Sequence, residues 1–202
     1  MKLYYSKGAC SLVPRIVIYE IGLKSEFESV NLKDKVTESG TNFLEINPKG
    51  AVPVLLTDNG KILTENAVIQ QYLADTHHAT DLLPPISDFN RYRVLEWLNY
   101  VSTDLHKGFG PLFNPKVTEE MKKDVFRPNL ISKLKIVDKS LGKSFIMGSN
   151  FTLPDAYLFV MIYWLPKVNI SLDEFANLGS YFERLKERDS VAKAIADEGL
   201  KV

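Results

Sequence analysis

The stretch that decides the fold is residues 47–69, NPKGAVPVLLTDNGKILTENAVI. Turn-forming residues open it, and Val52–Leu56 then forms a predicted strand that has its proline near the start, where a missing N–H donor is tolerated. The Asp-Asn-Gly turn at 58–60 predicts a hairpin into a second strand, Lys61–Leu63. Ala67–Asp75 has a helical pattern, so the stretch predicts a β-β-α unit.

A β-α-β unit precedes this stretch. Residues 2–5, KLYY, form a short β-prone run before a turn, and apolar residues then recur at spacings of three and four from Leu12 to Gly22. Phe27–Leu32 predicts the next strand, and the polar stretch 33–42 predicts a loop or a short helix. The whole order, β-α-β followed by β-β-α, indicates a small mixed α/β domain.

The rest of the chain predicts helices. Residues 79–88 contain a Pro-Pro pair without a helical period, which indicates a linker. Helical patterns dominate the remaining sequence at 89–107, 118–141, 153–165 and 180–197. We therefore expect an α/β domain over 1–78, a linker over 79–88 and an all-helical domain over 89–202.

Composition excludes several classes of protein. The 202 residues are 45% hydrophobic, which is enough to bury a core, and 25 basic residues balance 25 acidic ones. Without a basic excess, broad binding to nucleic acid is not expected. The longest apolar run, Ala156–Pro166, is shorter than the ~20 residues that a membrane span requires. With no secretory signal and a single cysteine, the sequence predicts a soluble, cytoplasmic protein.

The single cysteine, Cys10, lies between the first strand and the first helix. Unpaired N–H groups and the helix dipole at that point favour a negative sulfur and can lower a thiol pKa from about 8.5 towards roughly 3.5–7.5. A small buried hydrophobe is the competing interpretation, although Gly8, Ala9 and Ser11 make a turn rather than an apolar face. These residues leave the two readings balanced.

A dithiol cycle is excluded for this cysteine. The second cysteine of a dithiol oxidoreductase would stand three residues on, where this chain has Val13. Any redox chemistry of Cys10 therefore needs an external thiol, and glutathione is the abundant candidate.

Three motifs resemble the glutathione transferase family. The string 47–53 with the strand after it is similar to the family's N-terminal signature, and so is 63–69 at the start of a helix. Residues 150–156, NFTLPDA, resemble the C-terminal capping motif. Because the thiol-site residue is Cys10 and a His106-Lys107 pair follows downstream, the pattern resembles the bacterial beta class over essentially the whole chain.

The resemblance implies a thioredoxin-like N-terminal domain followed by an all-α domain with a pocket for an electrophile. It implies conjugation of glutathione, the substrate, to hydrophobic electrophiles in detoxification, with thiol-transfer activity through Cys10. The alternatives are a glutathione-dependent disulfide oxidoreductase or peroxidase of the same fold, and a non-catalytic binding protein. A homodimer is expected, and no metal, nucleic acid or membrane partner is.

The resemblance also implies a set of site residues. Cys10 and His106 are the predicted catalytic residues. Val52 is expected to pair through its backbone with the cysteinyl part of the ligand, beside a cis bond to Pro53. Glu65 is matched to the ammonium group of glutathione and Lys35 to its glycine carboxylate. The full predicted glutathione-binding set is Tyr5, Cys10, Ser11, Lys35, Val52, Pro53, Glu65, Asn66, Asn99, Thr103, His106 and Lys107.

Several of these assignments have simpler alternatives. Asn66 starts a helix, where free N–H groups bind anions, but Asn is also an ordinary helix cap. Lys35 could equally be a solvated loop lysine, and Tyr5 and Ser11 could serve packing.

The helix over 89–107 carries two stripes. The apolar stripe is Val94, Leu98, Val101 and Leu105, and the polar one is Asn99, Thr103 and His106. At about 100° per residue the polar stripe points away from the apolar core. It faces solvent, the other domain or a second subunit, and the resemblance assigns it to the glutathione cleft.

The helix over 153–165 is apolar nearly all round, which predicts that it is the core of the helical domain. Thr152 and Asp155 fit a capping box at its start.

Overall fold

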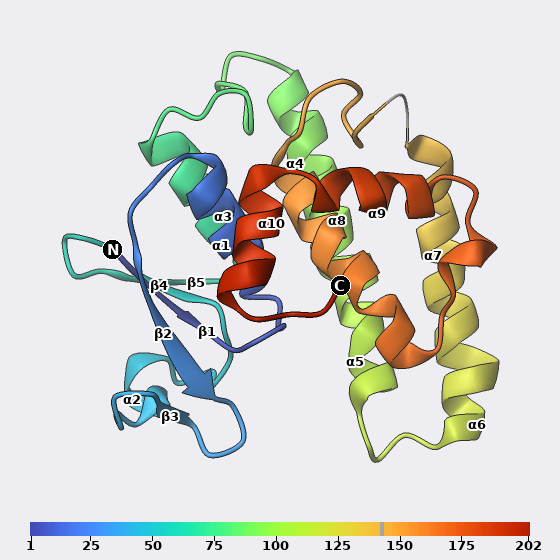
Figure 1. The fold of residues 1–202 in the computed structure, drawn as a ribbon, viewed down its shortest axis with the longest axis horizontal. Coiled ribbons are helices and arrows are strands. Elements are labelled where there is room, and N and C mark those ends of the chain that lie inside the picture. The colour runs from blue at the N-terminus through green and yellow to red at the C-terminus, as the bar shows by residue number, and fades with distance from the viewer. Residues whose placement is uncertain (142–143) are drawn as a thin grey trace. The chain divides into compact units, whose positions relative to one another are not determined.

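The chain folds into an α/β unit and a helical unit, which confirms the predicted fold class. The computed structural model describes residues 1–141 and 144–202. Met1–Thr80 and Glu187–Val202 make up the α/β unit, and Asp81–Lys186 the helical unit (Figure 1). The C-terminal end thus differs from the predicted domain over 89–202, because the last helix, α10 (Asp189–Asp197), packs on α1 (Leu12–Glu20).

A five-stranded sheet organises the α/β unit. Its strand order is β3-β2-β1-β4-β5, and only β1 and β2 run parallel, with Leu3 opposite Phe27. The strands are β1 (Lys2–Tyr5), β2 (Glu26–Asn31), β3 (Val36–Thr37), β4 (Val54–Leu56) and β5 (Ile62–Thr64). The parallel pair needs the crossover helix α1, as the β-α-β pattern predicted.

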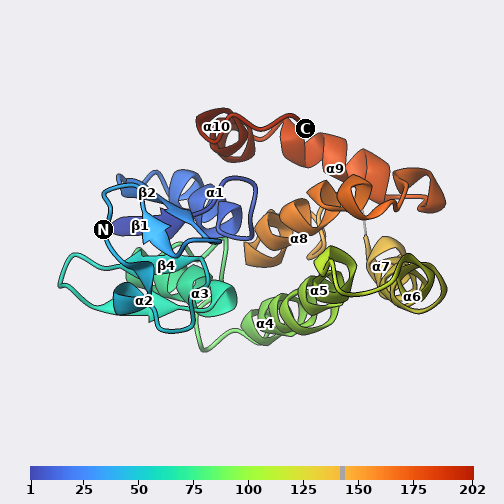
Figure 2. The same ribbon diagram turned by 90° about the horizontal axis from the view of Figure 1, so that it is seen from below.

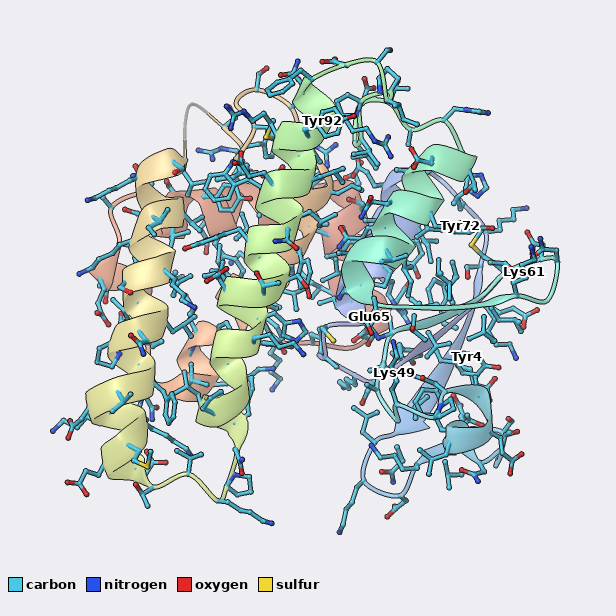
Figure 3. All side chains as sticks on the ribbon, turned by 180° about the vertical axis from the view of Figure 1, so that it is seen from behind. Tyr4, Lys49, Lys61, Glu65, Tyr72 and Tyr92 are labelled. Atoms are coloured by element: carbon cyan, nitrogen blue, oxygen red, sulfur yellow. The ribbon has the colours of Figure 1, made fainter. Side chains whose placement is uncertain are left out.

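Side chains of successive strand residues point to opposite faces of the sheet, so both faces are packed. Leu3 and Tyr4 are both buried but point to opposite faces, because successive strand residues alternate. Tyr4 belongs to a core cluster with Phe43 of the short helix α2 (Phe43–Ile46), and Figure 3 shows it beside that helix. Elsewhere in the unit, α1 packs against both α3 (Asn66–Thr76) and α10.

Two long helical columns, a buried helix and the shorter helical elements after it form the described part of the helical unit. The first column is α4 (Asn90–Tyr100), the π-helical η1 (Val101–His106) and α5 (Lys107–Phe113). The second is α6 (Glu119–Met121), the π-helical η2 (Lys122–Phe126) and α7 (Arg127–Ser140). Then follow α8 (Leu153–Tyr163), the 3-10 turns η3 (Leu165–Val168) and η4 (Leu172–Glu174), and α9 (Leu178–Lys186).

Helix α8 is the core of this unit, as predicted. Every residue from Leu153 to Ile162 is buried, and Figure 2 shows α8 between the α4–α5 column and α9. The predicted capping box is present, with the backbone N–H of Thr152 donating to Asp155 Oδ2 at 2.8 Å. None of the helices in the described part of the chain is long and apolar enough to cross a bilayer.

Three elements differ from the sequence prediction. The polar stretch 33–42 contains the two-residue strand β3, which pairs with β2 and is too short to leave a pattern. The single helix predicted over 89–107 continues to Phe113 and passes through a π-helical segment. The helix predicted over 180–197 is two helices, α9 and α10, separated by Glu187 and Arg188.

Candidate functional site

The loop that carries Cys10 is fixed in its conformation by side-chain hydrogen bonds within the loop. Ser11 Oγ accepts the backbone N–H of Ser6 at 3.0 Å and donates to the Ser6 carbonyl at 3.2 Å. Gly8 has φ +67°, a backbone conformation that favours glycine. Ser11 is fully buried, so its hydroxyl closes the loop and places Cys10 just before α1.

Cys10, Val52 and Asn66 come together from three separate segments. Cys10 Sγ donates to the Val52 carbonyl at 3.3 Å, and Asn66 Nδ2 donates to the Cys10 carbonyl at 2.7 Å. The bond between Val52 and Pro53 is cis, as expected. The thiol is partly exposed, whereas Val52 and Asn66 are buried. A half-open thiol therefore lies among backbone polar groups at the start of two helices, α1 and α3.

Glu65 stands where β5 ends and α3 begins. Its φ of +71° and ψ of +117° are strained values for a residue with a side chain. The side chain is 65% exposed, and its carboxylate accepts Lys49 Nζ at 2.6 Å. The strained backbone presents the carboxylate beside the first turn of α3.

Lys35 reaches the loop that precedes the cis bond. Its Nζ donates to the Gly50 carbonyl at 2.7 Å, and its own φ is +57°. The structure thus brings Lys35 to the same loop as Lys49 and Val52. The neighbouring Lys33 stays exposed.

The contact of the Tyr5 ring is with a buried charged group rather than with the Cys10 thiol. Its ring lies 4.2 Å from the Arg15 guanidinium, and Phe27 stacks on the same group at 4.0 Å. Arg15 Nε is 3.2 Å from Glu198 Oε1, and both side chains are buried. Glu198 Oε2 also accepts the Gly8 N–H at 2.8 Å, and burial raises the pKa of this carboxyl.

Sequence reasoning missed Arg15 and Glu198. Arg15 lies within the apolar pattern of α1, and Glu198 is 190 residues from the Gly8 that it contacts. No local pattern signals a pair so far apart in the chain. The C-terminal segment is nevertheless part of the support for the Cys10 loop.

In the helical unit, the residues of the predicted polar stripe do not all lie in the same environment. The apolar stripe of Val94, Leu98, Val101 and Leu105 is buried as predicted, and Asn99 and Thr103 are exposed. Thr103 Oγ1 donates to the Asn99 carbonyl at 3.0 Å, and Thr103 lines a cavity of about 240 Å³ together with Lys107.

His106 does not share the exposed face of Thr103. Its Nδ1 lies 2.6 Å from the hydroxyl of the buried Tyr157, and its ring meets Trp164 edge-on at 5.3 Å. The π-helical turn of η1 explains the change, because its extra residue per turn rotates His106 away from the face expected at 100° per residue. Burial and the charge of Lys107 lower the pKa of His106 to about 4. The imidazole is therefore neutral at physiological pH.

An aromatic cluster adjoins this histidine. Trp164 meets Phe109 and Phe113 edge-on, each at 5.4 Å, and the two phenyl rings stack at 5.9 Å. Phe109 is buried, but Phe113 is 46% exposed. The cluster can contact an apolar ligand. Tyr157 and Trp164 were seen in the sequence only as core residues of the apolar helix, a pattern that carries no functional signal.

No metal centre is evident in residues 1–141 and 144–202. No group of three or more His, Cys, Asp or Glu side chains is placed to hold an ion there.

Family models of known proteins match both the N-terminal and the C-terminal part of the chain. Residues 1–75 match the family model of the glutathione S-transferase N-terminal domain, and residues 100–189 match that of the C-terminal domain. The chain is 44% identical over 202 residues to the glutathione S-transferase GstA of Escherichia coli, and the match covers 100% of both chains.

Solved structures agree with these matches. A glutathione S-transferase of a sphingomonad, complexed with glutathione, is 39% identical with a TM-score of 0.94 and covers 100% of both chains. A beta class glutathione S-transferase of Sphingomonas chungbukensis has the same identity of 39%, the same TM-score of 0.94 and the same 100% coverage. Two family models in order and full-length identity above 40% leave one conclusion: the chain belongs to the glutathione S-transferase family.

Proposed function

We propose that the protein binds glutathione in the α/β unit and conjugates its thiolate to hydrophobic electrophiles, as a detoxifying enzyme. The single observation that carries this proposal is the cluster of Cys10, Val52 and Asn66, joined by hydrogen bonds of 3.3 and 2.7 Å. The complex of the sphingomonad relative with glutathione supports the choice of ligand.

Each end of the tripeptide has a proposed partner. The Val52 backbone pairs with the cysteinyl residue, beside Pro53, and the free N–H groups of α3 at Asn66 take the γ-glutamyl carboxylate. The Glu65 carboxylate takes the ammonium group, and Lys35 takes the glycine carboxylate by exchanging its bond to the Gly50 carbonyl. Ser11 acts through the loop that it closes, and Tyr5 acts through Arg15, whose partner Glu198 accepts the Gly8 N–H of that loop.

The chemistry needs an ionised thiol. A free thiol has a pKa of about 8.5, so it is mostly protonated at neutral pH, and hydrogen-bond donors with the helix dipole shift it towards the thiolate. The sulfur then forms a bond to the electrophilic carbon. In substitution the leaving group departs with its bonding electrons, and in addition the substrate takes a proton. The thiol proton passes to solvent, because the His106 imidazole, with its pKa lowered to about 4, is too weak a base to hold it at neutral pH. The proposed role of His106 is instead that of a neutral hydrogen-bond donor.

The helical unit carries the groups that we propose for the electrophile. His106, with Trp164, Phe109 and Phe113 around it, forms the apolar surface for the electrophile. Asn99, Thr103 and Lys107 contribute exposed polar groups to the glutathione cleft, some of them across a homodimer.

A second activity is favoured by the partly exposed Cys10 sulfur. Its thiolate attacks the sulfur of a glutathione mixed disulfide, a new S–S bond forms, and the other thiolate leaves. A second glutathione thiolate then attacks this enzyme-bound disulfide, releases oxidised glutathione and restores Cys10. As the main cycle, this chemistry would make the protein a glutathione-dependent disulfide oxidoreductase. A peroxidase of the same fold would differ in its first step: a peroxide oxidises the Cys10 thiolate to a sulfenic acid and leaves as an alcohol or water, and glutathione then forms the same enzyme-bound disulfide with loss of water.

The substitution Cys10→Ala separates the two activities. We expect glutathione binding to change less than about 10-fold, because the backbone groups of Val52 and Asn66 remain, and thiol transfer to a small disulfide to fall at least about 100-fold. Calorimetry, conjugation of chlorodinitrobenzene and disulfide reduction are the three measurements. If the substitution leaves all three unchanged, Cys10 is not central. If the native chain binds no glutathione, it is a non-catalytic member of the family.

We further propose that the protein is a cytoplasmic homodimer. Support for the dimer comes from exposed apolar side chains at the start of α4, with Ile86 74%, Phe89 69% and Tyr92 53% exposed. Such a group suits an interface better than solvent. Light scattering on the purified protein gives the mass: twice the chain mass supports the dimer, and the chain mass itself contradicts it.

A further inference from the structure

A lysine holds the carboxylate to which we assign the substrate's ammonium group. Lys49 Nζ lies 2.6 Å from Glu65 Oε1 and 3.0 Å from Thr64 Oγ1. Figure 3 shows the two labelled side chains close together, below the start of α3. A primary ammonium therefore already makes, within the chain, the contact that a ligand's ammonium would make.

Both partners are fixed in place by their backbones. The Lys49 N–H donates to Asn47 Oδ1 at 3.2 Å, and the next residue, Gly50, is tethered through its carbonyl to Lys35. Glu65 is fixed by its position between β5 and α3, with a φ of +71° that the surrounding structure must maintain. The ion pair thus joins side chains that come from two ordered backbone segments.

We propose that Lys49 is an internal competitor for the ammonium group of glutathione. In the ligand-free protein it occupies the Glu65 carboxylate, and glutathione binds by exchanging one ammonium for another. This inference rests on the proposed function of Glu65. Like charges that share one carboxylate repel each other, so the lysine must withdraw as the substrate's ammonium arrives.

The exposure of the pair sets the size of the effect. The side chains of Lys49 and Glu65 are 58% and 65% exposed, so water screens their attraction and a displaced lysine remains hydrated. Pairs of this kind are weak, and relief of the competition corresponds to about 1.5- to 5-fold in affinity. Lys49 therefore lowers the affinity for ligands that carry an ammonium group, without preventing their binding.

The test compares Lys49→Gln with the native chain by calorimetry. We expect the variant to bind glutathione about 1.5- to 5-fold more tightly. The same tripeptide with hydrogen in place of the γ-glutamyl amino group should gain nothing, because it does not compete for Glu65. Lys61→Gln is the matched control, since it removes the same charge from an exposed lysine that Figure 3 shows at the hairpin tip, away from Glu65.

Other outcomes overturn the inference. If Lys49→Gln weakens binding of glutathione, the lysine assists the ligand's carboxylates. If Lys49→Gln tightens the binding of glutathione and of the tripeptide without the amino group equally, the effect comes from the change in overall charge. The same conclusion holds if Lys49→Gln tightens binding no more than Lys61→Gln does. Glu65→Gln distinguishes a failure of the proposed function: should it leave glutathione binding unchanged, Glu65 does not receive the ammonium. If Glu65→Gln weakens binding and Lys49→Gln does not tighten it, the competition alone is wrong.

Discussion

Cys10 owes its setting to residues that touch its backbone and its loop. Asn66 donates to its carbonyl, Ser11 closes its loop, and the Val52 carbonyl accepts a hydrogen bond from its thiol. Asn66 had two readings in the sequence, helix cap and ligand-binding residue. The structure shows a third use of its side chain, a tie between α3 and the Cys10 loop.

At the scale of single residues, the sequence identified groups but not their partners. Cys10, Val52, Glu65 and Lys35 were all named from motifs or from a resemblance, and their role in binding stays a prediction. The contacts of Lys49 could not be foreseen, because they depend on the turn of the backbone at positive φ. Tyr157 beside His106 was hidden for a different reason, since the two lie 51 residues apart in the chain.

The pH dependence of stability tests the environment of His106. Its pKa is lowered from 6.5 to about 4, chiefly by burial. As the pH falls through this window, the unfolded chain takes up a proton that the folded chain does not, so stability is lost with falling pH. The loss attributable to His106 is on the order of 3 kcal/mol between neutral pH and pH about 4.

Urea unfolding of the native chain and His106→Gln across this range measures the effect. The variant should show a flatter dependence of unfolding free energy on pH. Equal slopes for the two proteins would show that His106 titrates alike in the folded and unfolded chains.

At the scale of elements, the periodicity of the sequence predicted most of the helices and strands that the structure contains. The strands β1, β2, β4 and β5 and the helices α1, α3, α4, α7 and α8 all lie within or close to the predicted ranges. Short or irregular elements were missed, because β3 has two residues and the π-helical turns keep an apolar spacing close to that of an α-helix. The break between α9 and α10 follows from packing on α1, which no local pattern records.

Helix α8 depends on its first turn. Asp155 accepts the N–H and hydroxyl of Thr152, the N–H of Ile146 and the hydroxyl of Tyr181, all at 2.6 to 2.9 Å in a buried setting. Asp155→Ala leaves these donors without an acceptor and should cost about 3–5 kcal/mol of unfolding free energy.

Denaturant unfolding of this variant measures that cost. Asp189→Ala is the matched control, because Asp189 also lies in the first turn of a helix, α10, but is exposed. The control should cost less than about 1 kcal/mol. A similar small loss in both variants would mean that the buried network does not hold α8.

At the scale of the whole molecule, the chain's end supports the site at its beginning. Besides the contact of Glu198 with Gly8, Arg188 pairs with Glu20 at 2.7 Å, and Tyr19 donates to Asp197 at 2.6 Å. These bonds explain why residues 187–202 belong to the α/β unit. A domain boundary drawn from local patterns could not include them, because they join segments more than 160 residues apart.

Glu198→Ala tests this support. The substitution leaves the buried Arg15 without its carboxylate, so we expect a loss of about 3 kcal/mol or more in unfolding free energy. Amide hydrogen exchange over residues 6–11 should also accelerate, since the Gly8 N–H loses its acceptor. The exposed Glu187→Ala is the control and should change neither property. If amide hydrogen exchange over residues 6–11 is unchanged in Glu198→Ala, the conformation of this loop does not depend on the contact with Glu198.

The central claim is that the protein binds glutathione and ionises its thiol. The direct measurement is the ultraviolet absorbance of the thiolate as a function of pH, for glutathione bound to the Cys10→Ala variant, which contributes no thiol of its own. We predict that the bound thiol titrates at least about one pH unit below the value of about 8.5 for a free thiol. A bound thiol that titrates like the free one, or a protein that binds no glutathione, would contradict the account.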